Sequence, residues 1–194
     1  MRYLDLERTC FFLVGATRRG RLRSTAIVDR VQEALKGSDI IFIRDKNEMQ
    51  YKDSIRDFMK RIGQGKCIVV VLSKKYLESK SCMFELTEIA DIGNIRDRVF
   101  PIVLHDAKVY DAIERVPYIK YWEQRKQELD AAMKEVSGEY LQGVREELDL
   151  FAKIRGTIAQ IVDILGDMNA LTPDQHQGSN FDSLLRALET RLSE

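Results

Sequence analysis

The chain has 194 residues, 44% hydrophobic and 32% charged, which is typical of one globular domain, or one domain with an appendage, that buries its own core. Its 31 basic and 31 acidic side chains cancel, and this balance argues against direct nucleic-acid binding, which favours a basic excess. We expect a cytoplasmic protein without membrane contact, because no signal peptide is visible and no apolar run approaches the ~20 residues that cross a bilayer.

The cysteines and histidines argue against a metal site. The three cysteines are Cys10, Cys67 and Cys82, an odd number with wide spacing, and the two histidines, His105 and His176, are far apart in the sequence. No Cys-x-x-Cys pair is present to bind zinc. Unpaired cysteines of this kind indicate a reducing compartment, in agreement with the cytoplasm.

Four short apolar runs predict β-strands, at residues 10–14, 40–43, 67–72 and 99–104. Each run is continuous rather than alternating, as expected for strands covered on both faces. A fifth strand is predicted near residues 118–122, before a charged helix that extends through Val136. The sequence thus predicts a parallel sheet of about five strands.

Amphipathic patterns between these runs predict helices. Their expected N-caps are small polar residues, namely Ser24, Asp53 or Ser54, and Ser81. Gly37 and Gly63 are expected to end the first two helices. Alternating strands and helices at this spacing predict an α/β fold with helices on both faces of the sheet.

The pattern changes after Gly138, where no strand signal remains. Phe181 to Leu192 predicts a final helix, and a loop is expected before it, at Pro173, Gly178 and Ser179. A longer helical seam precedes that loop, with apolar residues at alternating steps of three and four: Phe151, Ile154, Ile158, Ile161, Leu165 and Met168. We therefore predict an α/β domain over residues 1–137 and a helical extension over residues 138–194 that packs on it. The seam could alternatively bind a partner helix.

Ligands of open parallel sheets bind beyond the carboxyl ends of the strands, which selects four loops here. They are residues 15–23, 44–52, 73–81, and the segment from His105 onward. The first loop contains Arg18, Arg19, Arg21 and Arg23, which could bind phosphates or form a solvated basic loop. It lacks the glycine patterns of dinucleotide dehydrogenases and P-loop enzymes.

Three residues near these loops have ordinary structural explanations. Glu85, in the first turns of a helix capped by Ser81, could simply interact with the helix dipole. Cys82 is expected to be packed, since no histidine is placed to activate it. His105 is expected to be a hydrogen-bonded loop histidine.

Several segments, in this order, resemble the bacterial Toll/interleukin receptor (TIR) domains that cleave NAD. They are Ile-Arg-Asp-Lys-Asn at 43–47, Tyr-Lys-Asp-Ser-Ile-Arg-Asp-Phe-Met at 51–59, Lys-Tyr-Leu-Glu-Ser at 75–79, Cys-Met-Phe-Glu-Leu at 82–86 and Arg-Val-Phe-Pro-Ile-Val-Leu at 98–104. The resemblance continues through residues 118–122 and covers most of the chain from Ile40 onward.

The resemblance implies a flavodoxin-like three-layer sandwich and an NAD glycohydrolase that breaks the nicotinamide–ribose bond. It implies that Glu85 is the catalytic residue, and that NAD is the substrate, with no cofactor or metal. The NAD site is then expected to be lined by residues of the loops and of the Glu85 segment: Gly15, Ala16, Thr17, Arg18, Arg44, Asp45, Asn47 and Ser81. Enzymatic members often carry Trp at the position of Ser81, so the product, linear or cyclic ADP-ribose, stays open.

The resemblance also implies a homo-oligomer in which the loop Asp45 to Tyr51 of one copy completes the site of the next. A bacterial defence role, and a fused or separate sensor domain as a further partner, are implied in the same way. Two other functions remain open. One is a non-catalytic TIR module that signals by self-association, and the other is a nucleoside-transferring enzyme of related fold that also uses a glutamate.

Overall fold

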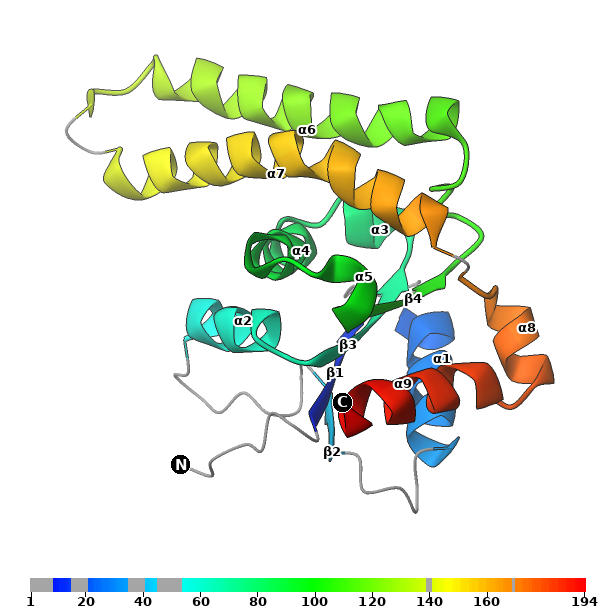
Figure 1. Ribbon diagram of the computed structural model, residues 1–194. Helices are drawn as coiled ribbons and strands as arrows, with labels where there is room; N and C mark the ends of the chain where they lie inside the picture. The colour runs from blue at the N-terminus through cyan, green and yellow to red at the C-terminus, as the bar shows by residue number, and fades with distance from the viewer. Residues whose placement is uncertain (1–8, 15–20, 35–40, 45–53, 139–140, 169) are drawn as a thin grey trace. The chain divides into compact units, whose positions relative to one another are not determined.

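A computed structural model describes residues 9–14, 21–34, 41–44, 54–138, 141–168 and 170–194. The chain divides into two compact units (Figure 1). The first joins Met1–Ala107 with Met168–Glu194, and the second is Lys108–Asp167. Among the described residues, no helix combines the length and apolar character needed to cross a membrane.

A parallel sheet forms the centre of the first unit. Its strands are β1 (Thr9–Val14), β2 (Ile41–Arg44), β3 (Cys67–Leu72) and β4 (Val99–Val103), in the order β2-β1-β3-β4. All six residues of β3 are buried, as its continuous apolar run predicts for a central strand. The four predicted runs are thus confirmed as strands to within a residue at each end.

The predicted fifth strand is wrong. Residues 118–122 lie inside helix α6 (Ala112–Met133), whose N-cap is Asp111. Tyr118 and Trp122 are both buried, and their spacing of four residues places them on one side of a helix. A short apolar run cannot distinguish a strand from a helix by itself, and here the long charged segment after it continues the helical pattern. In the described part of the chain the sheet has four strands.

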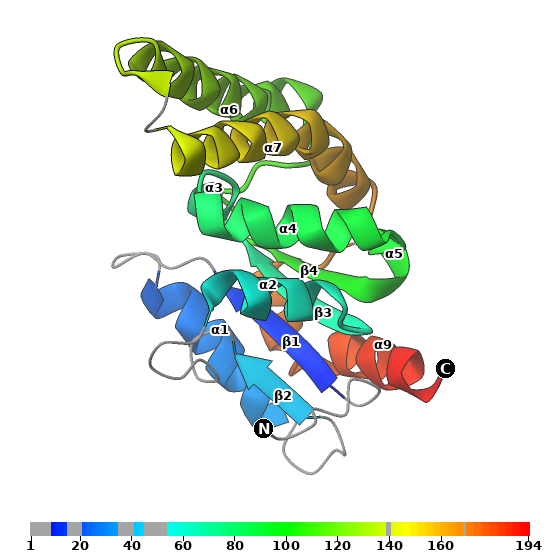
Figure 2. The ribbon, with the colours of Figure 1, turned by 90° about the vertical axis from the view of Figure 1, so that its left-hand side faces the viewer.

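Helices α1 (Arg21–Ala34) and α9 (Asp182–Ser193) cover one face of the sheet (Figures 1 and 2). α1 begins three residues before Ser24, so Ser24 is not its N-cap, and Gly37 lies outside the described residues. Because side chains alternate along a strand, β3 presents every second residue to these helices. The resulting core cluster includes residues of the sheet, α1 and α9: Cys10, Cys67, Val69, Val71, Ile102, Ile27, Val28, Val31, Phe181, Leu184 and Leu188.

The other face of the sheet is covered by α2 (Ile55–Gly63) and α4 (Lys80–Ile92), which pack against each other (Figure 2). The short helices α3 (Lys74–Leu77) and α5 (Ile95–Arg98) precede and follow α4. Ser54 caps α2 by accepting a hydrogen bond from the backbone N–H of Asp57, which confirms one of the two predicted caps. The first unit therefore has three layers, with helices on both faces of a parallel sheet.

The second unit is a hairpin of two antiparallel helices, α6 and α7 (Gln142–Asp167). The apolar seam predicted for α7 is buried, at Phe151, Ile154, Ile158, Ile161 and Leu165, whereas Met168 follows the end of the helix. The Trp122 ring contacts the Phe151 ring, with 5.6 Å between centroids. Ion pairs from Arg115 to Asp163 and from Arg155 to Glu123, both with N–O distances of 2.7 Å, also connect the helices.

The segment predicted as a loop before the last helix contains a short helix, α8 (Pro173–Gly178). Thr172 and Gln175 form a capping box, and Pro173 takes the first helical position, where its missing N–H costs nothing. The compact units also differ from the predicted division at residue 137. α9 covers the sheet of the first unit, while α6 pairs with α7 in the second.

Candidate active site around Glu85

Glu85 is positioned by the connection that follows β3. Ser73 caps α3 by accepting from the backbone N–H of Tyr76, and Ser79 caps α4 by accepting from the N–H of Cys82 at 3.4 Å. The prediction that Ser81 caps this helix is therefore wrong. α4 begins two residues earlier than expected, and Ser81 is an exposed residue of its first turn.

The earlier start of α4 weakens the structural explanation for Glu85. Counted from Ser79, Glu85 is the sixth helical residue, and the first turn of α4 contains no acidic side chain. The helix dipole acts mainly within the first turn, so it contributes little at this position. Glu85 is nevertheless only 5% exposed. Burial of a carboxylate is costly unless other groups interact with it, and Glu85 does interact with other groups.

Glu85 shares one side of α4 with a residue that adjoins α2. Ser81, Glu85 and Glu88 are spaced by four and three residues, so they share one stripe of α4. A Cβ atom added at Gly63, the last residue of α2, would lie 3.3 Å from the Cβ of Glu88, which shows that this stripe adjoins α2. Glu85 thus lies on the side of α4 that adjoins α2 through Glu88.

The same edge of the sheet receives the other predicted site loops. β1 ends at Val14 and β2 ends at Arg44, and the carboxyl ends of parallel strands share one edge. α4 begins just beyond the end of β3 at this edge, and α2 begins there too, after residues 45–53. Arg44 is therefore at the edge where the Glu85 helix starts. Six predicted site residues lie outside the described residues: Gly15, Ala16, Thr17, Arg18, Asp45 and Asn47.

All three cysteines are free and buried. The prediction that Cys82 is a packed thiol is therefore confirmed. Cys10 and Cys67 are direct neighbours on β1 and β3. Hydrogen bonding to Cys67 and burial raise the pKa of the Cys10 thiol, so it stays protonated. Within the described ranges, no group of three or more His, Cys, Asp or Glu side chains could bind a metal ion.

His105 follows β4 and is exposed, with its Nε2 atom 3.4 Å from Asp174 Oδ2 on α8. This contact agrees with the interpretation of His105 as a hydrogen-bonded loop histidine. Sequence reasoning assigned nothing to His176, which is 4% exposed and stacks on the Phe181 ring, with 5.5 Å between centroids and 12° between planes. Burial lowers the pKa of His176.

Sequence reasoning also missed Arg98, the last residue of α5, which is 6% exposed. Its Nε and Nη1 atoms each donate a hydrogen bond of 3.0 Å, to the carbonyl oxygens of Gly65 and Gly93, and Nη2 donates to the carbonyl of Gly63. The only feature of the sequence that could have drawn attention to Arg98 is its position directly before an apolar strand.

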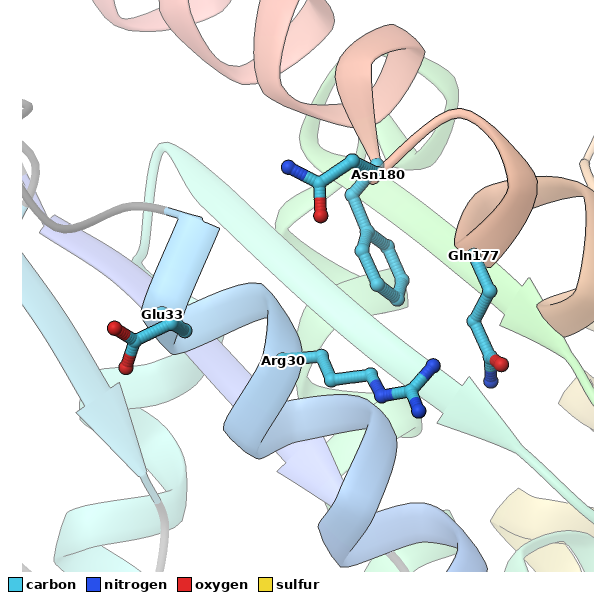
Figure 3. A pocket seen from close by; sticks show the side chains of 5 residues that line it. Arg30, Glu33, Gln177 and Asn180 are labelled. Carbon is cyan, nitrogen blue, oxygen red and sulfur yellow. The ribbon is translucent and has the colours of Figure 1, made fainter.

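A polar pocket of about 260 Å³ lies between α1 and the turn from α8 to α9 (Figure 3). It is lined by Arg30, Glu33, Gln177, Asn180 and Phe181. These elements cover the face of the sheet opposite α4, so the pocket does not include Glu85. It lies outside the candidate site described here.

The comparisons with known proteins agree with the three-layer fold. No curated protein sequence matches the chain. Among solved structures, the chain is similar to the TIR domains of the activated Roq1 resistosome that directly recognizes the pathogen effector XopQ. That match has a TM-score of 0.56 and 18% sequence identity, and it covers 96% of this chain and 98% of the other. The sequence profile that matches residues 21–137, more than half of the chain, is that of the TIR domain, and the chain belongs to this family.

Proposed function

We propose that this TIR domain is an NAD glycohydrolase in which Glu85 is the catalytic residue. The observation that carries the proposal is a carboxylate with 5% exposure, beyond the reach of the helix dipole, on the helix that starts at the ligand-binding edge of the sheet. Membership of the TIR family and the resemblance of residues 82–86 to the catalytic segment of its NAD-cleaving members support the same assignment.

The reaction needs one carboxylate rather than two. The bond that breaks joins C1′ of the ribose to the pyridinium nitrogen of nicotinamide. The bonding electron pair leaves with nicotinamide, which departs as a neutral molecule and needs no proton from a general acid, unlike the leaving group in ordinary glycoside hydrolysis. Positive charge develops on the ribose. Water then attacks C1′ and releases a proton, giving ADP-ribose, or an adenine nitrogen attacks and gives the cyclic product.

Glu85 would stabilise this transition state electrostatically. A fixed carboxylate near the ribose interacts more strongly with the positive charge of the transition state than with the ground state, which accelerates the reaction. Burial of Glu85 strengthens the interaction, because the effective dielectric constant around a buried group is lower than in water. The same carboxylate could bind the ribose hydroxyls and orient the ring.

The diphosphate and the second ribose of NAD require hydrogen-bond donors at the carboxyl edge of the sheet. Arg44 at the end of β2, together with Arg18, Asp45 and Asn47, would contact the diphosphate and ribose, and Gly15 to Thr17 would offer backbone N–H groups. Ser81, exposed one turn before Glu85 on the same stripe, would line the entrance. The strand order β2-β1-β3-β4 is consistent with the flavodoxin-like order, whose ligands bind at this edge.

We further propose that self-assembly activates the enzyme. The loop Asp45 to Tyr51 leads into α2, which packs against the Glu85 helix, so a loop contributed by a neighbouring copy could complete the site. The similar Roq1 structure is described as an activated resistosome, which is an assembly. A cytoplasmic defence role, with a fused or separate sensor domain as the activator, fits this form of control.

Glu85→Gln tests the proposal, with Glu88→Gln as a matched control from the same stripe one turn later. The substitution keeps size and hydrogen bonding but removes the charge, so nicotinamide release should fall by about 10²–10³-fold while the fold and NAD binding persist. Glu88→Gln should retain the parent rate. Turnover of Glu85→Gln above about a tenth of the parent rate would contradict the mechanism.

The alternative function is a non-catalytic TIR module that signals by self-association. It is favoured by the similarity to TIR domains in an assembly, which by itself requires no chemistry. The parent protein decides between the two. If it releases no nicotinamide from NAD in any assembled state, the module hypothesis replaces the enzyme. If release depends on an added acceptor base, the activity is nucleoside transfer instead.

A further inference from the structure

A buried guanidinium connects the C-terminal ends of α4, which carries Glu85, and of α2, which packs against α4. Arg98 donates to the carbonyl oxygens of Gly63 and Gly65, at and just after the end of α2, and to that of Gly93, the C-cap of α4. The last carbonyls of a helix have no partner within the helix, and they form the negative end of its dipole. A cation at this position therefore gives hydrogen-bond donors to the carbonyl groups at the ends of both helices and interacts favourably with both helix dipoles.

The shape of the guanidinium suits this arrangement better than any other side chain. Three of its nitrogen atoms are used, each with a different carbonyl, and its planar fork fixes their relative directions. Arg98 is buried next to Arg191 of α9, and burial and this second cation both lower its pKa. Burial of this charge is costly, so the three hydrogen bonds to backbone carbonyls are needed to compensate for it.

We infer that Arg98 is a positioning residue for Glu85, because it fixes α2 and α4 relative to each other. This inference rests on the proposed NAD-cleaving function. Glu85 lies eight residues before Gly93, about 12 Å along a rigid helix. Loss of the hydrogen bonds at one end allows the helices to shift, and the shift reaches Glu85 at the other end. A misplacement of about 1 Å can reduce a reaction rate by about 10²-fold.

Arg98→Met and Arg98→Lys test the inference, with Arg96→Met as a control from the exposed side of the same short helix. Nicotinamide release is measured at saturating NAD, at a temperature where circular dichroism shows each variant to be folded. Arg98→Met should lower kcat by about tenfold or more with little change in KM, since the helices shift but the substrate still binds. Arg98→Lys keeps the charge without the fork and should restore only part of kcat. Arg96→Met should match the parent.

Chemical rescue separates positioning from general stability. In Arg98→Ala, added methylguanidinium should restore kcat with a saturable dependence on concentration, whereas methylammonium at equal ionic strength should not. A folded Arg98→Met protein with the parent kcat overturns the inference. If Arg98→Met does not fold, the folded Arg98→Lys variant decides by the same criterion. Absence of nicotinamide release from the parent itself would instead reject the proposed function.

Discussion

The polar side chains that the structure buries are satisfied in different ways. Thr87 donates to the carbonyl of Phe84 within its own helix, at 2.8 Å, and Arg98 donates to three carbonyls. For His176, neither ring nitrogen has a hydrogen-bond partner among the described residues. Buried polar groups without partners are rare and costly, so His176 should influence stability in a way that depends on its protonation.

Because His176 is buried, we expect the protein to lose stability in mild acid. Its folded-state pKa is lowered by burial, below the ordinary value of 6.5. Below pH 6.5 the unfolded chain therefore binds more protons at this residue than the folded chain, and the free energy of unfolding decreases as the pH falls toward the folded-state pKa. The melting temperature measured from pH 7.5 down to pH 5 should show this decrease. In His176→Phe, which keeps a ring against Phe181, the slope that begins near pH 6.5 should be reduced.

His105→Phe is the matched control, because His105 is the only other histidine and is exposed beside Asp174. It shows how much of the parent pH slope remains when the other histidine is replaced instead. The comparison uses the slope rather than the melting temperature itself, since a larger ring at residue 176 can change packing at every pH. Equal slopes in the parent and in His176→Phe would contradict the lowered pKa of His176.

The role of a single residue can be predicted from the sequence only where its neighbours in the sequence form a recognisable pattern. Glu85 is predicted because the five-residue segment 82–86 resembles a catalytic segment, and its burial is compatible with that role. The predicted cap of α4 differs by two residues from the observed one, because Ser79 and Ser81 are both good N-cap residues. Arg98 and His176 could not be found, because their partners come from segments whose proximity only the fold establishes.

At the scale of elements, the α6–α7 hairpin makes a separate prediction. Ile158 is fully buried in the seam of α7. Ile158→Asp places a charge among apolar side chains and should destabilise the hairpin by roughly 3 kcal/mol or more. The single tryptophan, Trp122, belongs to this hairpin and contacts Phe151, so its fluorescence during urea unfolding reports on this unit directly.

Gln160→Asp, an exposed position on the same helix, controls for the added charge and should leave the urea midpoint nearly unchanged. The circular dichroism signal of the whole chain, measured in parallel, shows whether both compact units unfold together. A tryptophan transition in Ile158→Asp at the parent midpoint would mean that the seam is not essential to the hairpin. The seam would then be available to a partner helix, the alternative that its periodicity left open.

The periodic elements were the most predictable part of the fold. The strands β1 and β3 follow from continuous β-branched and aromatic runs, and the seam of α7 follows from steps of three and four residues. The errors occur where local signals conflict. Residues 118–122 have strand-like composition but continue into a long helix, and Pro173 signals a loop but also suits the first position of α8.

At the scale of the whole molecule, no local pattern predicts that the chain leaves the first unit after Ala107 and returns to it at Met168. α9 covers the same face of the sheet as α1, although the whole hairpin separates α9 from β4 in the sequence. Periodicity identifies an apolar helix face but not the surface that it covers. The particular face of the sheet that α9 covers therefore needed the structure, whereas the α/β class and the packing of the extension on that domain were predicted from the sequence.

We predict that the activity of the protein depends on its assembly. If a loop of one copy completes the site of the next, the active species forms by mass action, and specific activity should fall steeply over about a thousandfold dilution. Head-to-tail contacts of this kind join two different surfaces, so they can build rings or open filaments. Sedimentation velocity across the same concentrations should show active fractions to be oligomeric. Constant specific activity in a monomer would reject activation by assembly.

Mixing two inactive variants tests the shared site directly. Glu85→Gln lacks the carboxylate proposed to be catalytic but has an intact loop, whereas Met49→Asp in the loop Asp45 to Tyr51 should impair assembly but keep Glu85. In a mixed assembly, the loop of a Glu85→Gln copy can complete the site of a Met49→Asp copy. The mixture should therefore regain a fraction of the parent activity that neither variant has alone. A double variant, Glu85→Gln with Met49→Asp, added in place of Glu85→Gln should give no such recovery, because it supplies no intact loop. If the simple mixture stays inactive while both proteins are folded, each site is complete within one chain.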